Sequence, residues 1–171
     1  GHRVDLYEKE KDILQAASGI NQYRLHQGYH YPRSKETILL AKEGQKSFRA
    51  AYREAVIEDP VEHYYCVAKE KSFLSAAQCC AIWDECDLPY QKHKLNLINP
   101  KNIALTVKVK EQLIDPEKLR ELSWQKLRAN GVNVFLNTET KEEDLDRYHV
   151  IVIATYANNN ALLSKFPHAK K

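Results

Sequence analysis

The distribution of apolar and polar residues predicts one strand and one long helix in the first third of the chain. Residues 4–8 alternate in polarity and include β-branched and aromatic side chains, which predicts a short strand that ends at Glu8. Apolar side chains recur at roughly helical spacing over residues 35–56, and Ser34 just before them is a typical N-cap. We therefore expect the chain to pass from a strand to a helix through a polar segment.

The middle of the chain continues with a strand, a helix and a second strand. Residues 62–68 have a composition typical of strands. A helix is expected to begin near Ser72 and to carry Phe73 and Trp83 on one apolar face, where Trp83 belongs to the core. The apolar side chains of residues 103–109 alternate, which fits a strand with one buried face.

The last third is expected to hold a helix followed by two strands. Asp115 can accept the free amide hydrogens at a helix start, Pro116 suits the first helical position, and Gly131 supplies the stop. Residues 132–136 read as the next strand. Residues 148–154 are nearly all apolar, as expected for a central parallel strand buried on both faces. The order of elements predicts the α/β class.

Composition and charge exclude several classes of protein. The 171 residues are 43% hydrophobic and 29% charged, which is typical of a globular domain. No apolar run approaches the ~18 residues of a membrane helix, and no secretion signal is present at Gly1, so we expect a cytoplasmic protein. A net charge of +3 spread along the chain does not indicate nucleic-acid binding. The four cysteines form no C-x-x-C pair, so buried, reduced thiols are expected.

Residues 16–34 contain an unusual density of polar and aromatic side chains, which suits a site better than a core. An arginine such as Arg33 can clamp a carboxylate by a two-pronged hydrogen bond. Histidines such as His26 and His30 titrate near neutral pH and can act as bases. We therefore predict that these three residues are catalytic and that they form, with Tyr29 and Tyr31, a wall of a substrate site. A polar loop packed under a helix is the alternative.

Glu8 stands where a dinucleotide-binding βαβ unit places the acid that hydrogen-bonds a ribose hydroxyl. In that unit a glycine-rich phosphate loop lies about 20 residues upstream of the acid, which would place it before Gly1. The five glycines of the chain form no G-x-G-x-x-G. Either there is no dinucleotide site, or its first strand and loop precede this sequence.

Several segments resemble the D-amino-acid-oxidase-like family of FAD-dependent oxidoreductases, in the order in which that family has them. Residues 1–9, GHRVDLYEK, resemble its second strand. Residues 17–28 resemble its alanine- and serine-rich stretch leading to a His-x-Gly beside the flavin, and residues 29–34, YHYPRS, continue like one of its subgroups.

Two later segments extend the resemblance over nearly the whole chain. Residues 111–119 look like the strand and D-P-x-x-L helix of the family's substrate-binding excursion, and residues 130–132 like the helix exit. Residues 150–155 are similar to a returning strand that ends in Ala-Thr-Gly near the cofactor. Tyr156 stands here in place of that glycine, and a side chain at this position bears on how closely the backbone can approach FAD.

The resemblance implies a fold and a cofactor. The fold is a partial FAD-binding Rossmann-like sheet with an inserted α+β substrate-binding region, divided into residues 1–60, 61–130 and 131–171. Glu8 would bind the adenosine ribose, the turn at residues 18–21 would approach the pyrophosphate or the flavin, and Thr140 would contact adenine. The implied cofactor-binding residues are Glu8, Ser18, Gly19, Asn21, Arg24, Thr140, Ala154 and Thr155.

The activity implied by the resemblance is oxidation of a small amine, amino acid or hydroxy acid by hydride transfer to FAD. This chain by itself is expected to be inactive, because the phosphate loop would precede it. Two alternatives stay open. One is a non-catalytic α/β domain that binds a protein or peptide, and the other is a nucleotide-binding protein that uses Glu8 without a flavin.

Overall fold

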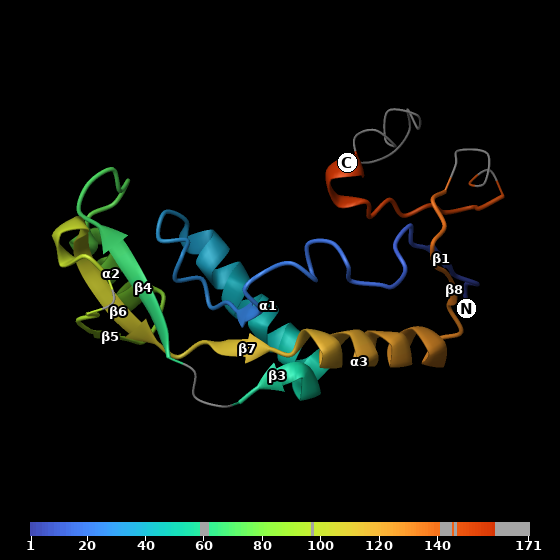
Figure 1. Cartoon of the computed structure of the whole chain (residues 1–171), viewed down its shortest axis with the longest axis horizontal. Coiled ribbons are helices and arrows are strands. Elements are labelled where there is room, and N and C mark those ends of the chain that lie inside the picture. The colour runs from blue at the N-terminus through green and yellow to red at the C-terminus, as the bar shows by residue number, and fades with distance from the viewer. Residues whose placement is uncertain (59–61, 97, 141–144, 146, 160–171) are drawn as a thin grey trace. The chain divides into compact units, whose positions relative to one another are not determined.

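The computed structural model describes residues 1–58, 62–96, 98–140, 145 and 147–159 (Figure 1). By their contacts they divide into two units, one of residues 1–15 with 127–171 and the other of residues 16–126. Helices and strands mix in the chain, which confirms the α/β class. The three-part division expected from the sequence stays a prediction.

The first unit is built on a pair of parallel strands. Strand β1, Asp5–Tyr7, pairs with β8, Asn133–Phe135, so that Asp5 lies opposite Asn133 and Tyr7 opposite Phe135. The Asn133 side-chain amide donates to Asp5 Oδ1 over 2.7 Å, and the rings of Tyr7 and Phe135 stack with centroids 4.9 Å apart. These cross-strand pairs stabilise the register, and both strands were predicted from the sequence.

Helix α3, Pro116–Ala129, begins and ends as the sequence predicts. Asp115 Oδ1 accepts hydrogen bonds from the backbone amides of Glu117 and Lys118 over 2.9 and 3.0 Å. At the other end Gly131 has a φ of +64°, the left-handed conformation that favours glycine, and turns the chain toward β8.

The prediction of a buried central strand at residues 148–154 is wrong. These residues form no strand, and the side chains of Val150 and Val152 are 77% and 84% exposed. An apolar composition favours burial, but a strand also requires a neighbour that supplies backbone hydrogen bonds. Among the described residues no strand pairs with this segment, and the sheet of the first unit consists of β1 and β8.

The second unit contains two small antiparallel sheets. One has the order β4-β6-β5, with β4 at His63–Ala68, β5 at Tyr90–Lys92 and β6 at Ile103–Val109. The other has the order β2-β7-β3, with β2 at Arg24–Leu25, β3 at Val56–Ile57 and β7 at Gln112–Ile114. The strands predicted at residues 62–68 and 103–109 are confirmed.

Two helices complete the second unit, together with short 3₁₀ turns at Arg53–Ala55 and Pro100–Asn102. Helix α1, Lys35–Tyr52, begins at the expected N-cap, where Ser34 Oγ accepts from the Thr37 amide over 3.2 Å. Helix α2, Ala76–Glu85, begins later than predicted.

The cause of this later start is a capping box at Ser75. Its hydroxyl accepts from the backbone amide of Gln78, and the Gln78 side chain accepts from the Ser75 amide in return. Phe73 therefore precedes the helix and is 83% exposed rather than part of the apolar face.

The core of the second unit lies between α2 and the β4-β6-β5 sheet (Figure 1). Trp83 of α2 is buried as predicted, and it packs with Val107 and Val109 of β6. Its indole nitrogen donates to the carbonyl of Tyr29 over 3.1 Å, so the polar end of this large side chain is satisfied. Tyr29 is itself only 1% exposed. Part of the polar segment that precedes α1 thus belongs to the core.

The four thiols are free in the structure. Cys79 and Cys86 are buried as expected and Cys80 is partly buried, but Cys66 is exposed, so the expectation of burial is wrong for that residue. Cys66 lies on β4 with its side chain directed away from the core, an orientation that composition does not reveal. Among the described residues no group of histidine, cysteine and acidic side chains has the arrangement of a metal site, and no helix has the length and apolarity to span a membrane.

Gly28 is required where the chain passes α1. Its φ is +104°, and a Cβ atom there would lie 2.9 Å from the Ile38 Cα, closer than real Cβ contacts come. We predict that Gly28→Ala lowers the free energy of unfolding by more than about 1 kcal/mol, because it adds both backbone strain and a clash with the helix.

The matched control for this substitution is Gly44→Ala, inside α1, where a Cβ would meet no atom within 4 Å. It should raise the free energy of unfolding by roughly 1 kcal/mol, because alanine favours helix over glycine. Urea unfolding of both variants measures the difference. Equal shifts of the two midpoints would contradict the close-packing argument.

Candidate active site

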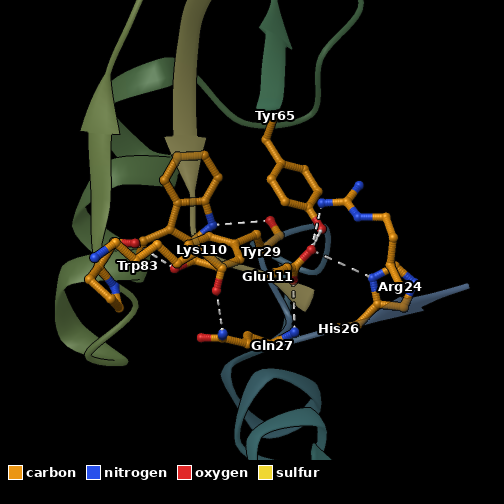
Figure 2. A network of polar contacts seen from close by, with 9 residues as sticks. Arg24, His26, Gln27, Tyr29, Tyr65, Trp83, Lys110 and Glu111 are labelled. Carbon is orange, nitrogen blue, oxygen red and sulfur yellow. Dashed lines mark hydrogen bonds and ion pairs between the residues drawn. The ribbon is translucent and has the colours of Figure 1, made fainter. Parts of the chain in front are cut away.

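A buried carboxylate organises the polar residues of the second unit (Figure 2). The side chain of Glu111, between β6 and β7, is completely buried. Its Oε2 atom accepts a hydrogen bond from Arg24 Nη2 over 2.5 Å and one from the Tyr65 hydroxyl over 2.8 Å. Its Oε1 atom accepts from the Gln27 backbone amide over 2.8 Å. One carboxylate therefore joins β2, the segment that follows β2, and β4.

The Arg24 guanidinium also packs over the Tyr65 ring beside this carboxylate. The guanidinium carbon of Arg24 lies 4.6 Å from the centre of the Tyr65 ring. The Arg24 side chain is only 15% exposed, so its charge depends on Glu111 for compensation. Burial raises the pKa of Tyr65 far above its ordinary value, and the neighbouring Glu111 raises it further, so this hydroxyl stays a hydrogen-bond donor.

Two histidines connect this cluster to the surface. His26 Nδ1 lies 3.9 Å from Glu111 Oε2 but forms no hydrogen bond within the described residues. The His26 and His30 rings lie 4.4 Å apart. Burial lowers the pKa of both below the ordinary 6.5, and the nearby His26 lowers that of His30 further. Neutral imidazoles at pH 7 are able to accept protons.

His30 and Arg33 lie on an open pocket of about 390 Å³. The pocket is bounded by the segment before α1, by β4, by the residues before α2 and by α2 itself. Its lining residues are Tyr29, His30, Pro32, Arg33, Tyr65, Cys66, Val67, Ala68, Ser72, Phe73, Leu74, Cys79 and Trp83. His26 does not line the pocket and lies next to His30. The structure thus brings the three predicted catalytic residues into one region, with two of them on the pocket.

Three of the four predicted cofactor residues of the second unit, Ser18, Gly19 and Asn21, lie in a tight turn, and the fourth, Arg24, lies on β2. The Asn21 amide donates to the carbonyls of Ala17 and Ser18 over 3.0 and 3.1 Å, and the Gly19 amide donates to the Ala16 carbonyl over 2.8 Å. Ser18 is exposed. The role of Asn21 in the structure is to close this turn, and Arg24, predicted to bind the cofactor, has its guanidinium engaged by Glu111. Cofactor binding by these residues stays a prediction.

In the first unit, Glu8 comes directly after β1. Its Oε1 atom accepts from the Glu10 amide over 2.9 Å, and its backbone pairs with Phe135 and Thr138. Its Oε2 atom has no hydrogen-bond partner among the described residues. A carboxylate held at the end of a parallel strand with one oxygen available fits a ribose hydroxyl.

The other predicted residues of the first unit lie after β8 and near the end of the described chain. Thr140 is half-buried and Ala154 is exposed. The amide and hydroxyl of Thr155 donate to Asn159 Oδ1 over 2.7 and 2.9 Å. Tyr156, which begins a 3₁₀ turn at Tyr156–Asn158, has a φ of +54°. The backbone thus adopts a conformation that favours glycine at the position where the resembled family has one.

Glu111, Tyr65 and His63 were not predicted as site residues. Glu111 stands in a polar sequence, Lys110-Glu111-Gln112, and nothing in that pattern indicates burial. His63 is 8% exposed, and burial lowers its pKa, with Arg24 contributing. These groups are brought together by the pairing of strands that are distant in sequence.

Two proteins from Aspergillus are similar to most of this chain. The FAD-dependent monooxygenase kojA of Aspergillus flavus and the probable FAD-dependent monooxygenase kojA of Aspergillus oryzae are each 30% identical to it over 145 residues, 80% of this chain and 33% of the relative. The FAD-dependent monooxygenase FPY4 of Fusarium mangiferae is 44% identical over 54 residues, 32% of this chain and 15% of the relative. The chain spans about a third of the length of the Aspergillus relatives. No protein-family model matches it.

All three relatives are named as FAD-dependent enzymes, which agrees with the cofactor expected from the sequence. The similarity supports a FAD-dependent oxidoreductase. The narrower assignment to the D-amino-acid-oxidase-like family, the substrate class and hydride transfer to the flavin remain predictions.

We predict that Glu111→Gln lowers the free energy of unfolding by about 3 kcal/mol, because the mostly buried Arg24 charge then has no counter-charge. The matched control is Glu85→Gln, which removes the exposed ion pair between Glu85 and Lys35 and should change stability little. Urea unfolding at pH 7 measures both variants. A loss for Glu111→Gln no larger than for Glu85→Gln would contradict the role of the buried carboxylate.

Stability should also fall as the pH decreases below about 6.5. The pKa values of His26, His30 and His63 are lowered in the folded chain, chiefly by burial, so the unfolded chain binds protons more readily. By linkage, their contribution is complete above the unfolded pKa and is lost as the pH falls from that value toward the folded pKa.

The measurement is the free energy of unfolding from pH 7.5 to pH 5. The double variant His26→Gln, His63→Gln should show a shallower decrease than the unmodified chain, whereas His149→Gln, at an exposed histidine, should keep the slope. Parallel pH curves for all three proteins would show that His26 and His63 are not responsible.

Proposed function

We propose that this chain is part of a FAD-dependent oxidoreductase in which Glu8 binds the adenosine ribose and the pocket beside His30 and Arg33 receives the substrate. The observation that carries the proposal is the similarity to FAD-dependent monooxygenases over 80% of the chain. The end of β1 adds support, because Glu8 stands where dinucleotide-binding sheets have their ribose-binding acid, and its Oε2 atom has no hydrogen-bond partner among the described residues.

The proposed reaction is oxidation of a small amine, amino acid or hydroxy acid, with FAD, when bound, supplying the acceptor for a hydride. The residues of this chain would bind and orient the substrate and move its proton. His30 lies on the pocket and burial lowers its pKa below the ordinary value, so its imidazole suits the role of proton acceptor. His26 lies behind it, with Nδ1 3.9 Å from the buried Glu111 carboxylate, whose negative charge would favour a proton on either imidazole.

Monooxygenation is the second candidate reaction, and the names of all three relatives favour it. The two reactions differ in the fate of molecular oxygen, since a monooxygenase transfers one oxygen atom to its product and an oxidase does not. Turnover under ¹⁸O₂ followed by mass spectrometry of the product distinguishes them. Assignment to the D-amino-acid-oxidase-like family, the segments 1–60, 61–130 and 131–171, and a cytoplasmic location belong to the same proposal.

The protein expressed from its complete reading frame should be yellow and show the visible absorption bands of bound flavin. Glu8→Gln should weaken FAD binding by about tenfold, because a charged hydrogen bond to the ribose is lost. Glu10→Gln is the matched control, because Glu10 is an exposed acid two residues away. Its contact with Glu8 is made by the backbone amide, which the substitution keeps.

Titration of the apoprotein with FAD, followed by quenching of flavin fluorescence, measures the affinities. A colourless, folded protein would overturn the proposed function. Equal losses of affinity in the two variants would overturn the role of Glu8 while leaving the cofactor assignment intact.

A further inference from the structure

The pocket of the second unit presents flat side chains to a ligand. The rings of His30 and Tyr65 are parallel to within 1°, with centroids 6.3 Å apart. Tyr29 stacks on Tyr65 at 5.4 Å and meets Trp83 edge-on at 6.0 Å, so the Tyr65 wall is supported by the core. Phe73, 83% exposed, stands at the opening. A rigid aromatic wall of this kind favours a planar ring.

The charge of the pocket has one sign. None of the residues that line the pocket is acidic, and among them Arg33 carries a permanent positive charge. The Arg33 guanidinium lies 4.7 Å above the Phe73 ring, and no carboxylate in the described part of the chain pairs with it. Its five donors are therefore available to a ligand, in the planar arrangement that matches a carboxylate.

The nearest acid behind the wall is already compensated. Glu111 receives hydrogen bonds from Arg24 and from the Tyr65 hydroxyl, and its side chain is completely buried. A cationic ligand in the pocket would meet the charge of Arg33, and no lining residue would offer it a negative charge. An anion would be attracted to Arg33, and no lining residue would repel it.

We propose that this pocket binds a planar organic anion, with its ring against Tyr65 and His30 and its carboxylate or enolate on Arg33. That this anion is the substrate of the oxidoreductase rests on the proposed function, and among the substrates proposed there it favours acids over amines. As a binding site it stands on the aromatic wall and on Arg33.

The experiment uses the chain of 171 residues without FAD. Three naphthalene probes of one shape and different charge are titrated: 2-naphthoate, 2-naphthamide and 2-naphthylmethylamine. Probe fluorescence measures binding, and the Arg33→Gln variant tests its location. The naphthoate should bind at least about tenfold more tightly than the amide, because a two-pronged bond to arginine is lost in the amide.

Arg33→Gln should remove this preference and bring the naphthoate affinity down to that of the amide. Arg53→Gln, at an exposed arginine outside the pocket, should leave it unchanged. Because the comparison of the three probes uses the unmodified chain, a poorly folded variant does not affect it.

Equal binding of naphthoate and naphthamide, or tighter binding of the amine, would overturn the inference. Naphthoate binding that Arg33→Gln does not weaken would also overturn it, because the anion would then bind elsewhere. These outcomes are independent of flavin absorption in the complete protein. If the complete protein is yellow but naphthoate does not bind in the pocket, the proposed substrate class is wrong and the oxidoreductase assignment stands. If the complete protein is colourless but naphthoate binds in the pocket, the oxidoreductase assignment is wrong and the anion site stands.

Discussion

The arrangement of the second unit depends on the buried pair between Glu111 and Arg24. Placing a carboxylate out of contact with water is costly unless its oxygens are hydrogen-bonded and its charge is compensated. Both requirements are met here by groups from separate parts of the chain, because Arg24 comes from β2 and Tyr65 from β4. The pair therefore ties the polar segment before α1 to the two small sheets. It also places His26 next to a negative charge and the Tyr65 ring against the pocket.

The pocket obtains its properties from this scaffold. Tyr65 has its hydroxyl on Glu111 and its ring on Tyr29, which in turn accepts the indole hydrogen of Trp83 through its carbonyl. The wall is thus continuous with the core and is pre-organised, while Arg33 and Phe73 lie on the open side. A rigid wall with an adaptable charged rim is a common arrangement in small-molecule sites. It agrees with the similarity of the chain to flavin-dependent enzymes, whose cofactor performs the redox chemistry while protein groups orient the substrate.

Local chemistry made most elements predictable. Ser34, Asp115 and Gly131 mark helix ends through hydrogen bonds and backbone conformations that involve only nearby residues. The errors occurred where two local signals competed or where a partner was required. Ser72 and Ser75 are both possible caps, and the reciprocal bond with Gln78 decides for Ser75. Residues 148–154 have the composition of a buried strand, yet composition cannot provide the neighbouring strand that a ladder needs.

The sequence by itself determined the α/β class, the positions of α1, α3 and the main strands, and the concentration of His26, His30 and Arg33 in one polar segment. It also indicated Glu8 at the end of β1 and FAD as the cofactor. Only the tertiary structure decided that Tyr29 belongs to the core, that Glu111 is buried, and that Arg33 faces a pocket without acids. The physical reason is the distance along the sequence between the residues that interact. Caps, turns and periodicity depend on residues a few positions apart, whereas burial and charge compensation join Arg24 to Glu111 across 87 positions.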